Sequence, residues 1–336
     1  MTAMRGIVAL LSACLLAGGL GVPESAAQPR KIQVAIPVAA LSFGPVYLAR
    51  DKGFFAAEGL DAQLTVVESG PVATQALAGG QMDVIVTGAS DVLVSHAKGV
   101  PLIAVQTVTR QTMEIVARRG FVEERRLTPE TPLAQRLAAL KGARFGITKP
   151  GALTDTVARW LLKKAGYDPI RDAEIVAVGG AGSQMAGLRQ NKVDLIIISP
   201  PIGPQVEHEG YGVVLIPPTD IPEFNEFVLN TTLIRREVAE RQPELAAKMV
   251  RALGRGINVM LDQPEESRRA LALHFPKIHP AVFGVSLERI RKRLVRDGRM
   301  VEAEWRNLMA LSLEAELLKR PLDTKEGGFW TNRFIR

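Results

Sequence analysis

The sequence predicts an α/β fold of two lobes, and three observations favour it. Strand-like and helix-like patterns alternate from Ile32 to about Ile216, as expected for mostly parallel sheets covered by helices. From Glu237 onward the pattern is nearly all helical. The length of 336 residues suits about two domains, and a hydrophobic content of 47% is ample for packed cores.

Eight short apolar runs are the predicted strands. They cover residues 32–36, 64–67, 84–86, 102–107, 144–148, 175–178, 195–198 and 213–216. Helices lie between these runs, and a glycine follows several of them where a left-handed residue is expected to end the helix. These glycines are Gly53, the pair Gly79 and Gly80, Gly99, Gly166 and Gly210.

The chain changes character after Ile216. Prolines interrupt it at Pro217, Pro218 and Pro222, and residues 227–234 form one extended segment. The predicted helices that follow cover residues 237–261, 264–274, 286–295 and 301–318. Earlier in the chain, the charged and proline-containing segment 118–138 is interpreted as a surface excursion.

The N-terminus has the pattern of a secretory signal peptide. Arg5 supplies a short positive region, residues 6–22 are an apolar run, and small residues precede a cleavage site after Ala27. A retained membrane anchor is less favoured, because the run is short and rich in glycine for a membrane span. We therefore expect residues 1–27 to be removed and the mature protein to be periplasmic.

Cys14, the one cysteine of the chain, leaves a second possibility for this segment. Residues 11–14 read Leu-Ser-Ala-Cys and resemble a lipobox, in which Cys14 would carry a lipid anchor. Cleavage after Ala27 would leave a mature chain without cysteine. Disulfides, thiolate metal sites and cysteine nucleophiles are then excluded.

The net charge of +7 does not identify a nucleic-acid or membrane-surface binder, because the basic residues are scattered. Their densest cluster, in residues 289–299, alternates with Leu287, Ile290, Leu294 and Val295. This is the pattern of an amphipathic helix with a solvated face, so no nucleic-acid partner is expected.

Four predicted helix starts follow strand ends, which is where open α/β sheets bind ligands. They lie at residues 40–45, 69–71, 87–91 and 149–155. Ser42 is placed to cap the first helix, and Pro71 to begin the second. The free N–H groups of a helix start contribute only about 0.3–1 kcal/mol to anion binding, so hydroxyl groups must add to it.

The hydroxyls placed for such hydrogen bonds are those of Ser42, Thr87, Ser90 and Thr154. Ordinary helix capping is the alternative role for each of them.

The chain resembles a family of periplasmic substrate-binding proteins. Residues 45–60, Pro-Val-Tyr-Leu-Ala-Arg-Asp-Lys-Gly-Phe-Phe-Ala-Ala-Glu-Gly-Leu, carry the most specific similarity. Looser matches lie at residues 140–147, at residues 161–169, and where Val193 and Asp194 lead to Ser199-Pro200-Pro201. Together they resemble the binding proteins of ABC importers for nitrate, taurine, aliphatic sulfonates and thiamine-precursor pyrimidines.

The resemblance implies a type II periplasmic-binding-protein fold, with a ligand cleft between two lobes and the C-terminal helices packed on the first lobe. Residues 28–109 and 222–336 would form lobe 1, and residues 110–221 would form lobe 2. The chain would cross between the lobes near residues 107–110 and return near residues 225–232.

The resemblance also implies a set of ligand-binding residues at the cleft. They are Leu41, Ser42, Phe43, Gly70, Thr87, Gly88, Ala89, Ser90, Gly151, Ala152, Leu153, Thr154 and Ser199. Members of the family often have Gly-Ser where this chain has Gly151-Ala152. The missing hydroxyl argues against a sulfonate or another strong oxyanion as the ligand.

The expected function is delivery of a small organic solute, anionic or heterocyclic, to the membrane permease of an ABC transporter. The protein is expected to act as a monomer, without cofactor, metal or catalytic residues. One alternative is a ligand-presenting partner of a periplasmic sensor. Another is an enzyme of the thiamine-pyrimidine type, but such relatives use a cysteine-rich motif that this chain lacks.

Other catalytic and metal-binding patterns are weak. The four histidines, His96, His208, His274 and His279, lie away from the predicted cleft and have no recognised metal-ligand spacing. Residues 179–183, Gly-Gly-Ala-Gly-Ser, lack the lysine and hydroxyl ending of a phosphate loop. They are interpreted as a turn into a helix.

Overall fold

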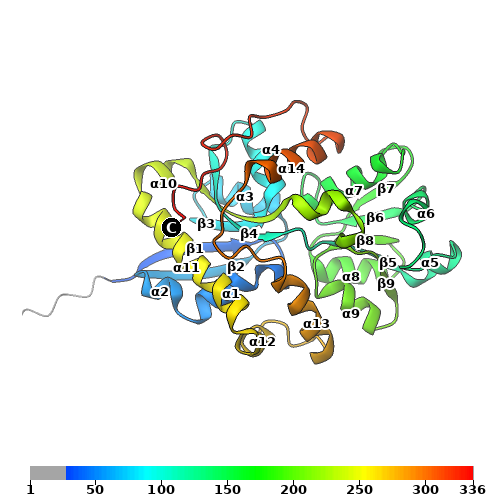
Figure 1. Cartoon of the computed structure of the whole chain (residues 1–336), viewed down its shortest axis with the longest axis horizontal. Coiled ribbons are helices and arrows are strands. Elements are labelled where there is room, and N and C mark those ends of the chain that lie inside the picture. Colours follow the sequence, from blue (N-terminus) through cyan, green and yellow to red (C-terminus); the bar gives the residue numbers. More distant parts are fainter. Residues whose placement is uncertain (1–27, 336) are drawn as a thin grey trace, which may run out of the picture.

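The computed structural model describes residues 28–335, which form two α/β lobes side by side (Figure 1). The predicted signal peptide, its cleavage after Ala27 and the lipidation of Cys14 lie outside the described residues.

The first lobe is built on a five-stranded sheet with the order β2-β1-β3-β10-β4. Its strands are β1 (Arg30–Ile36), β2 (Leu60–Val66), β3 (Val84–Gly88), β4 (Leu102–Arg110) and β10 (Val228–Arg235). Ile32, Val34 and Ile36 alternate along β1 and are all buried, as period-two packing requires. The sheet therefore combines an early part of the chain with one strand from much later.

The second lobe has its own five-stranded sheet, with the order β7-β6-β8-β5-β9. Its strands are β5 (Glu114–Arg118), β6 (Arg144–Ile147), β7 (Glu174–Ala177), β8 (Leu195–Ile198) and β9 (Gly212–Ile216). The chain thus leaves the first sheet after Arg110 and returns to it at Val228; the two connecting segments, residues 111–113 and 217–227, are called the crossings. All the predicted strands are present, and β5 is the one that the sequence analysis missed.

The expectation of mostly parallel sheets was wrong, because antiparallel pairs are as frequent as parallel ones. Strand β1 pairs in parallel with β2 and β3, and β6 with β7 and β8. Strand β10 is antiparallel to β3 and β4, and β5 is antiparallel to β8 and β9. The antiparallel strands are those by which the chain enters a sheet from the other lobe, and no crossover helix sets their direction.

Helices cover both sheets. In the first lobe they are η1 (Leu41–Phe43), α1 (Gly44–Asp51), α2 (Phe54–Ala57), α3 (Gly70–Ala78) and α4 (Ala89–Ala97). In the second lobe they are α5 (Arg119–Glu124), α6 (Leu133–Ala138), α7 (Leu153–Lys164), α8 (Ala181–Arg189) and α9 (Ile202–His208). The predicted left-handed helix ends are confirmed at Gly53, Gly80, Gly99, Gly166 and Gly210, whereas Gly79 is right-handed.

The C-terminal part follows two short 3-10 turns, η2 (Pro218–Asp220) and η3 (Pro222–Glu226). Its helices are α10 (Arg236–Arg241), α11 (Pro243–Asp262), α12 (Pro264–Ala272), α13 (Pro280–Arg291) and α14 (Glu302–Glu314). The single helix predicted over 237–261 is split at Gln242, because the residue before a proline is disfavoured in the helical region. Helix α13 begins and ends earlier than the predicted 286–295.

Helices α11 and α12 pack on α1 of the first lobe, as expected. A side chain at Gly256 would place its Cβ only 2.1 Å from the carbonyl oxygen of Pro45, so a glycine permits the close approach of α11 to α1. Helix α13 also contacts α9, and α14 contacts both α4 and α7. Helices α13 and α14 therefore connect the two lobes. In Figure 1, α14 lies above the crossings and α13 lies below them.

The surface excursion expected at 118–138 is only partly right. Phe121 of α5 is fully buried, and Arg136 of α6 is 5% exposed. Arg136 donates to the carbonyl oxygen of Leu215 at 2.7 Å and pairs with Asp220 at 2.7 Å. The segment therefore closes one end of the second lobe, because one face of each short helix packs inward.

Arg293, just after α13, holds both chain crossings. Its Nε donates to the carbonyl oxygen of Gln111 at 3.0 Å, and its Nη2 donates to that of Phe224 at 3.4 Å. Arg110 pairs with Glu304 of α14 at 2.5 Å. Side chains of the C-terminal segment thus fix the backbone of the crossings.

A second contact joins Glu114, at the start of β5, to Arg289 of α13 at 2.6 Å. Burial raises the pKa of Glu114 to about 7, although Arg289 acts to lower it. The second lobe is therefore tied to α13 close to the first crossing.

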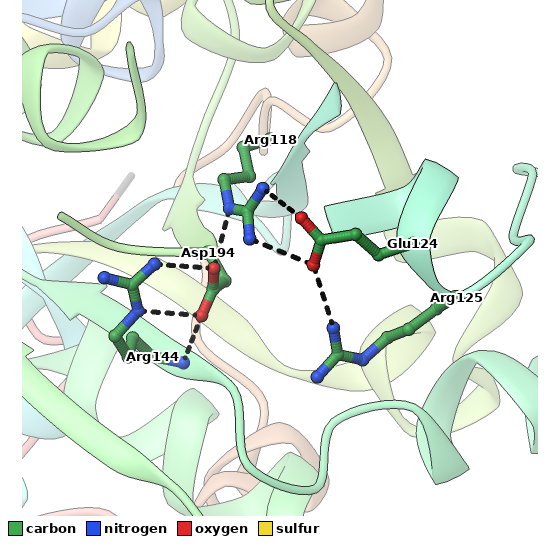
Figure 2. Close-up of polar contacts among 5 residues, drawn as sticks. All are labelled: Arg118, Glu124, Arg125, Arg144 and Asp194. Carbon is green, nitrogen blue, oxygen red and sulfur yellow. Dashed lines mark hydrogen bonds and ion pairs between the residues drawn. The ribbon is translucent and has the colours of Figure 1, made fainter. Parts of the chain in front are cut away.

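Asp194 organises three strands of the second sheet (Figure 2). Its carboxylate accepts from Arg118 Nε at 2.7 Å, and from the backbone N–H and the guanidinium of Arg144 at 2.9–3.0 Å. Burial acts to raise the pKa of Asp194, but these hydrogen bonds outweigh it and hold the pKa at about 2. The carboxylate therefore ties β5 and β6 to β8, the strand that begins directly after Asp194.

We predict that Asp194→Asn destabilises the protein by about 1.5–3 kcal/mol, because charge-assisted hydrogen bonds are lost. The native pKa lies below the ordinary value of 3.8. The stabilising effect of the carboxylate is therefore present above about pH 4 and is lost as the pH falls towards 2. Urea unfolding at pH 7 and pH 3 measures both effects.

Glu130→Gln, at an exposed site, is the control and should change stability by less than about 0.5 kcal/mol. Equal stability of Asp194→Asn and wild type at pH 7 would contradict this role.

Candidate functional site

A cavity lies between the two lobes, with about 530 Å³ of space between its walls, including its open mouth. Its lining comes from loops and helix starts at the carboxyl ends of strands, from the first crossing, and from the return strand β10. First-lobe and return-strand residues are Pro37, Val38, Ala40, Ser42, Phe43, Gly70, Thr87, Gly88, Asp91, Leu229 and Asn230. Residues of the first crossing and the second lobe are Met113, Thr148, Ala152, Leu153, Thr154, Gln184, Ile197, Ile198 and Ser199.

The start of α3 forms part of the first-lobe wall. Ser69 is its N-cap and accepts from the backbone N–H of Val72 at 3.5 Å, and Pro71 lies in the first turn. The predicted start of this helix is therefore confirmed. A Cβ at Gly70 would lie 1.9 Å from Oδ2 of Asp91, so only glycine leaves room for that carboxyl group.

Asp91, in the first turn of α4, is the one ionisable residue among the described residues that line the cavity. Its side chain is almost completely buried. Thr87 Oγ1 donates to Asp91 Oδ2 at 2.5 Å, whereas Oδ1 has no hydrogen-bond partner within residues 28–335. Burial raises the pKa of Asp91 to about 7, while the Thr87 hydroxyl and the Gly88 backbone act to lower it.

Two further lining residues have polar atoms without a partner in the described part of the chain: Oε1 of Gln184 and Nδ2 of Asn230. Gln184 belongs to α8 of the second lobe, and its Nε2 donates to the carbonyl oxygen of Gly179 at 3.3 Å. Asn230 lies on β10, opposite Gly88 of β3. A buried polar atom that lacks a partner costs about 1–3 kcal/mol, so a ligand or water at these positions is favoured.

The hydroxyls of the second-lobe wall are already paired. Thr154 Oγ1 accepts from the Thr148 backbone N–H at 3.0 Å and lies 2.9 Å from the Thr148 hydroxyl. Ser199 and Thr112 share a hydrogen bond of 2.7 Å. These hydroxyls therefore shape the wall, and Thr112 links the first crossing to the end of β8.

Nine of the thirteen residues expected to bind ligand line this cavity. They are Ser42, Phe43, Gly70, Thr87, Gly88, Ala152, Leu153, Thr154 and Ser199. The other four, Leu41, Ala89, Ser90 and Gly151, are not among its lining residues. Leu41, Ala89 and Ser90 are completely buried within the first lobe.

The helix cap expected at Ser42 was wrong, and the alternative capping role of Thr87 and Thr154 is not found either. Ser42 lies inside the turn η1, and the N-caps of α1, α4 and α7 are Phe43, Gly88 and Ala152, without a side-chain cap. The helices start one or two residues away from the hydroxyls, and so Thr87 bonds to Asp91 instead.

The sequence analysis did not select Asp91, Gln184 and Asn230 as site residues. Asp91 follows Thr87 by four residues in the same helix start, so its position was a usable signal. Asn230 and Gln184 gave none, because the return strand and α8 reach the cavity only through the tertiary fold.

The histidines lie outside the residues that line the cavity, as expected. The rings of His208 of α9 and His279 lie 4.4 Å apart and are tilted by 34°, and His274 stacks on Tyr47 at 4.4 Å. Within residues 28–335, no cluster of three or more His, Cys, Asp or Glu side chains is arranged to hold a metal ion. Residues 179–183 turn into α8, whose N-cap is Gly180. No helix in the described part is long and apolar enough to cross a membrane.

We predict that Asp91→Asn makes the ligand-free protein more stable at pH 8 than wild type, by roughly 1–4 kcal/mol. The native carboxyl keeps its proton up to about pH 7, whereas the unfolded chain loses it near 3.8. Wild-type stability therefore falls as the pH rises through this range, and the isosteric amide avoids the loss. Burial also raises the pKa of Glu114, which therefore contributes to the pH dependence of stability. This contribution is the same in both proteins and cancels when their stabilities are compared. Urea unfolding at pH 5 and pH 8 tests this, and a stability difference that is the same at both pH values would contradict it.

Comparisons with known proteins agree with this architecture. The formylaminopyrimidine-binding protein of Halalkalibacterium halodurans is 26% identical over 230 residues, which cover 67% of this chain and 64% of that protein. The matched part is thus slightly less than two thirds of that relative.

A protein of known structure from Bordetella bronchiseptica has a TM-score of 0.77 and 22% identity, covering 91% of this chain and 96% of its own. The periplasmic aliphatic sulphonate binding protein SsuA of Escherichia coli has a TM-score of 0.68 and 19% identity, covering 92% of each chain. The two structures confirm the two-lobed periplasmic-binding-protein fold. The model of the family described as NMT1/THI5 like matches residues 40–267, more than half of the sequence, and the chain belongs to that family.

Proposed function

We propose that this protein is an extracytoplasmic solute-binding protein, which captures a small organic solute between its lobes and delivers it to the permease of an ABC importer. The observation that carries the proposal is one cavity with unpartnered polar atoms from both lobes, Asp91 and Asn230 on one side and Gln184 on the other. A solute that bonds to both sides favours the closed arrangement of the lobes.

The lining of the cavity supports a small organic molecule. Its walls are mostly apolar, and a few polar groups face it from both lobes. Micromolar affinity requires about 8 kcal/mol. Apolar contacts with Phe43, Leu153 and Ile197 contribute to it together with hydrogen bonds to the unpartnered polar atoms.

The contact between the lobes at the cavity rim supports a closing motion. A Cβ at Gly88 of the first lobe would lie 3.1 Å from Cβ of Leu153 in the second. The two lobes are joined by the backbone at residues 111–113 and 217–227. Rotation about these crossings would separate Gly88 from Leu153 and open the cavity to solvent.

The lining supports binding without catalysis. Among the described lining residues there is no histidine, cysteine or lysine, and Asp91 is the only candidate acid or base. The names of two similar proteins, a formylaminopyrimidine-binding protein and a sulphonate-binding protein, support transport as the role. Residues 1–27, interpreted as a cleaved leader, support action in the periplasm, where we propose that the protein acts as a monomer.

We predict that Ala152→Trp abolishes solute capture. Ala152 is 4% exposed and lines the cavity at the start of α7, so an indole there would occupy the solute's place. The test is native mass spectrometry of protein isolated gently from the extracytoplasmic fraction of its host. Wild type should carry a bound small molecule, and Ala152→Trp should not.

Ala134→Trp is the matched control, because it adds the same side chain at an exposed position of α6. This variant should retain the solute. Equal retention by Ala152→Trp, with its fold intact by circular dichroism, would overturn the assignment of the site.

A further inference from the structure

Asp91 lies at the contact between the two lobes. A Cβ at Gly88 would lie 3.6 Å from Asp91 Oδ2 and 3.1 Å from Cβ of Leu153, the first residue of α7 in the second lobe. The start of α7 therefore closes over the start of α4, which carries the carboxyl group. In this closed arrangement Asp91 is 4% exposed.

A second pocket also has Asp91 in its wall. It is formed by α3, by α4 and the residues after it, and by Pro150 and Gly151 of the second lobe. Among the described residues, Asp91 is the only one that lines both this pocket and the solute cavity. Because each of the two spaces has a second-lobe wall, separation of the lobes would admit water to Asp91 from both.

In the closed arrangement the carboxyl group is incompletely paired. Its Oδ2 accepts from Thr87, whereas its Oδ1 has no partner within residues 28–335. An ionised carboxyl group in such surroundings is costly to remove from water, because neither a cation nor a full set of donors replaces its hydration.

Neighbouring charges do not offset this cost within the described chain. Lys98 is the only other charged residue that lines either space, and it is exposed and follows Asp91 by seven residues, about two helical turns. On α7, Asp155 accepts from the Gly151 backbone N–H and pairs with Arg159, each at 2.8 Å. Helix α3 and strand β3 carry no charged side chain, and the charged residues of β4, β10 and α14, which also pack on α4, line neither space.

We propose that Asp91 makes closure of the lobes conditional on a bound solute. Closure of the solute-free protein buries an ionised carboxyl group with one oxygen unpaired, whereas a solute that donates an N–H or O–H group to Oδ1 completes its hydrogen bonds. The ionised group therefore keeps the solute-free lobes apart and permits closure once the solute is bound. This inference rests on the proposed function, since it concerns the regulation of the same cavity.

A proton can take the place of the solute. In the closed arrangement burial raises the pKa of Asp91 to about 7, and in the open arrangement water returns its pKa towards the ordinary 3.8. Closure of the solute-free protein therefore transfers one proton from solvent to the carboxylate between about pH 4 and pH 7, and opening returns it to solvent. Closure is thus favoured at pH 5 and opposed at pH 8.

The first test is small-angle X-ray scattering of solute-free protein, prepared by unfolding in urea, dialysis and refolding. Wild type should have a larger radius of gyration at pH 8 than at pH 5, with a closing equilibrium constant at least tenfold lower at pH 8. Asp91→Asn cannot ionise, so its radius of gyration should be the same at both pH values and close to that of wild type at pH 5.

Glu130→Gln, which removes an exposed carboxylate, is the control and should follow wild type. A solute-free wild type whose radius of gyration does not change with pH would overturn the proposal. An Asp91→Asn variant that opens at pH 8 as wild type does would overturn it equally.

The second test separates this inference from the proposed function. Wild type that retains its co-purified solute should keep the small radius of gyration at pH 8, because the solute replaces the proton. If this loaded protein opens at pH 8 as the solute-free protein does, the role of Asp91 is wrong and solute capture stands. Wild type that carries no solute in native mass spectrometry would count against the proposed function, whereas the pH response of the solute-free protein would still decide the role of Asp91.

Discussion

The two chain crossings are the constraint on which the rest of the structure depends. Each lobe has its own sheet, but the chain passes between them only at residues 111–113 and 217–227. Arg293 donates to carbonyl oxygens of both crossings, and Glu114 and Arg110 pair with residues of the C-terminal segment. The placement of Asp91 opposite Gln184, and therefore the spacing of the whole site, follows from how these contacts hold the crossings.

The buried carboxyl group of Asp91 lowers the stability of the ligand-free protein, and the same group is available to bind a solute. An almost completely buried carboxyl group with a pKa near 7 costs free energy when it ionises, and in the described structure no cation offsets that cost. A native fold tolerates such a group where the surroundings position it, here through Thr87 and the space left at Gly70. A solute that donates hydrogen bonds to Asp91 would remove the cost on binding, which couples affinity to closure of the lobes.

The sequence was sufficient for those parts of the fold that depend on local pattern. Apolar runs located the strands, and prolines and glycines located most helix ends, because these signals act over a few residues. Strand β5 was missed because charged residues, Glu114 and Arg118, flank its three apolar positions, and the partners of these two residues include the distant Arg289 and Asp194. Strands β5 and β10 each pair antiparallel within their own sheet, and this direction likewise depends on the lobe from which the chain arrives.

In the candidate site, too, local sequence patterns predicted some features, whereas others depend on tertiary structure. Thr87 and Gly70 belong to helix starts that sequence patterns could locate, but their use could not be predicted. The hydroxyl of Thr87 was expected to bond to the ligand or to cap a helix, and in the described structure it bonds to the carboxyl group of Asp91. Asn230 and Gln184 are separated by 46 positions in the numbering and meet at the cavity only because β10 returns to the first sheet. Convergence of this kind depends on tertiary structure, and single-sequence patterns carry little information about it.

The most direct measurement of the central claim is a crystal structure of the protein purified with its own solute. A hydrogen-bond donor of the solute is expected within about 2.7–3.2 Å of Asp91 Oδ1, and a second donor at a similar distance from Gln184 Oε1. Both lobes would then contact one molecule. A solute bound outside this cavity, or one that contacts a single lobe, would contradict the account.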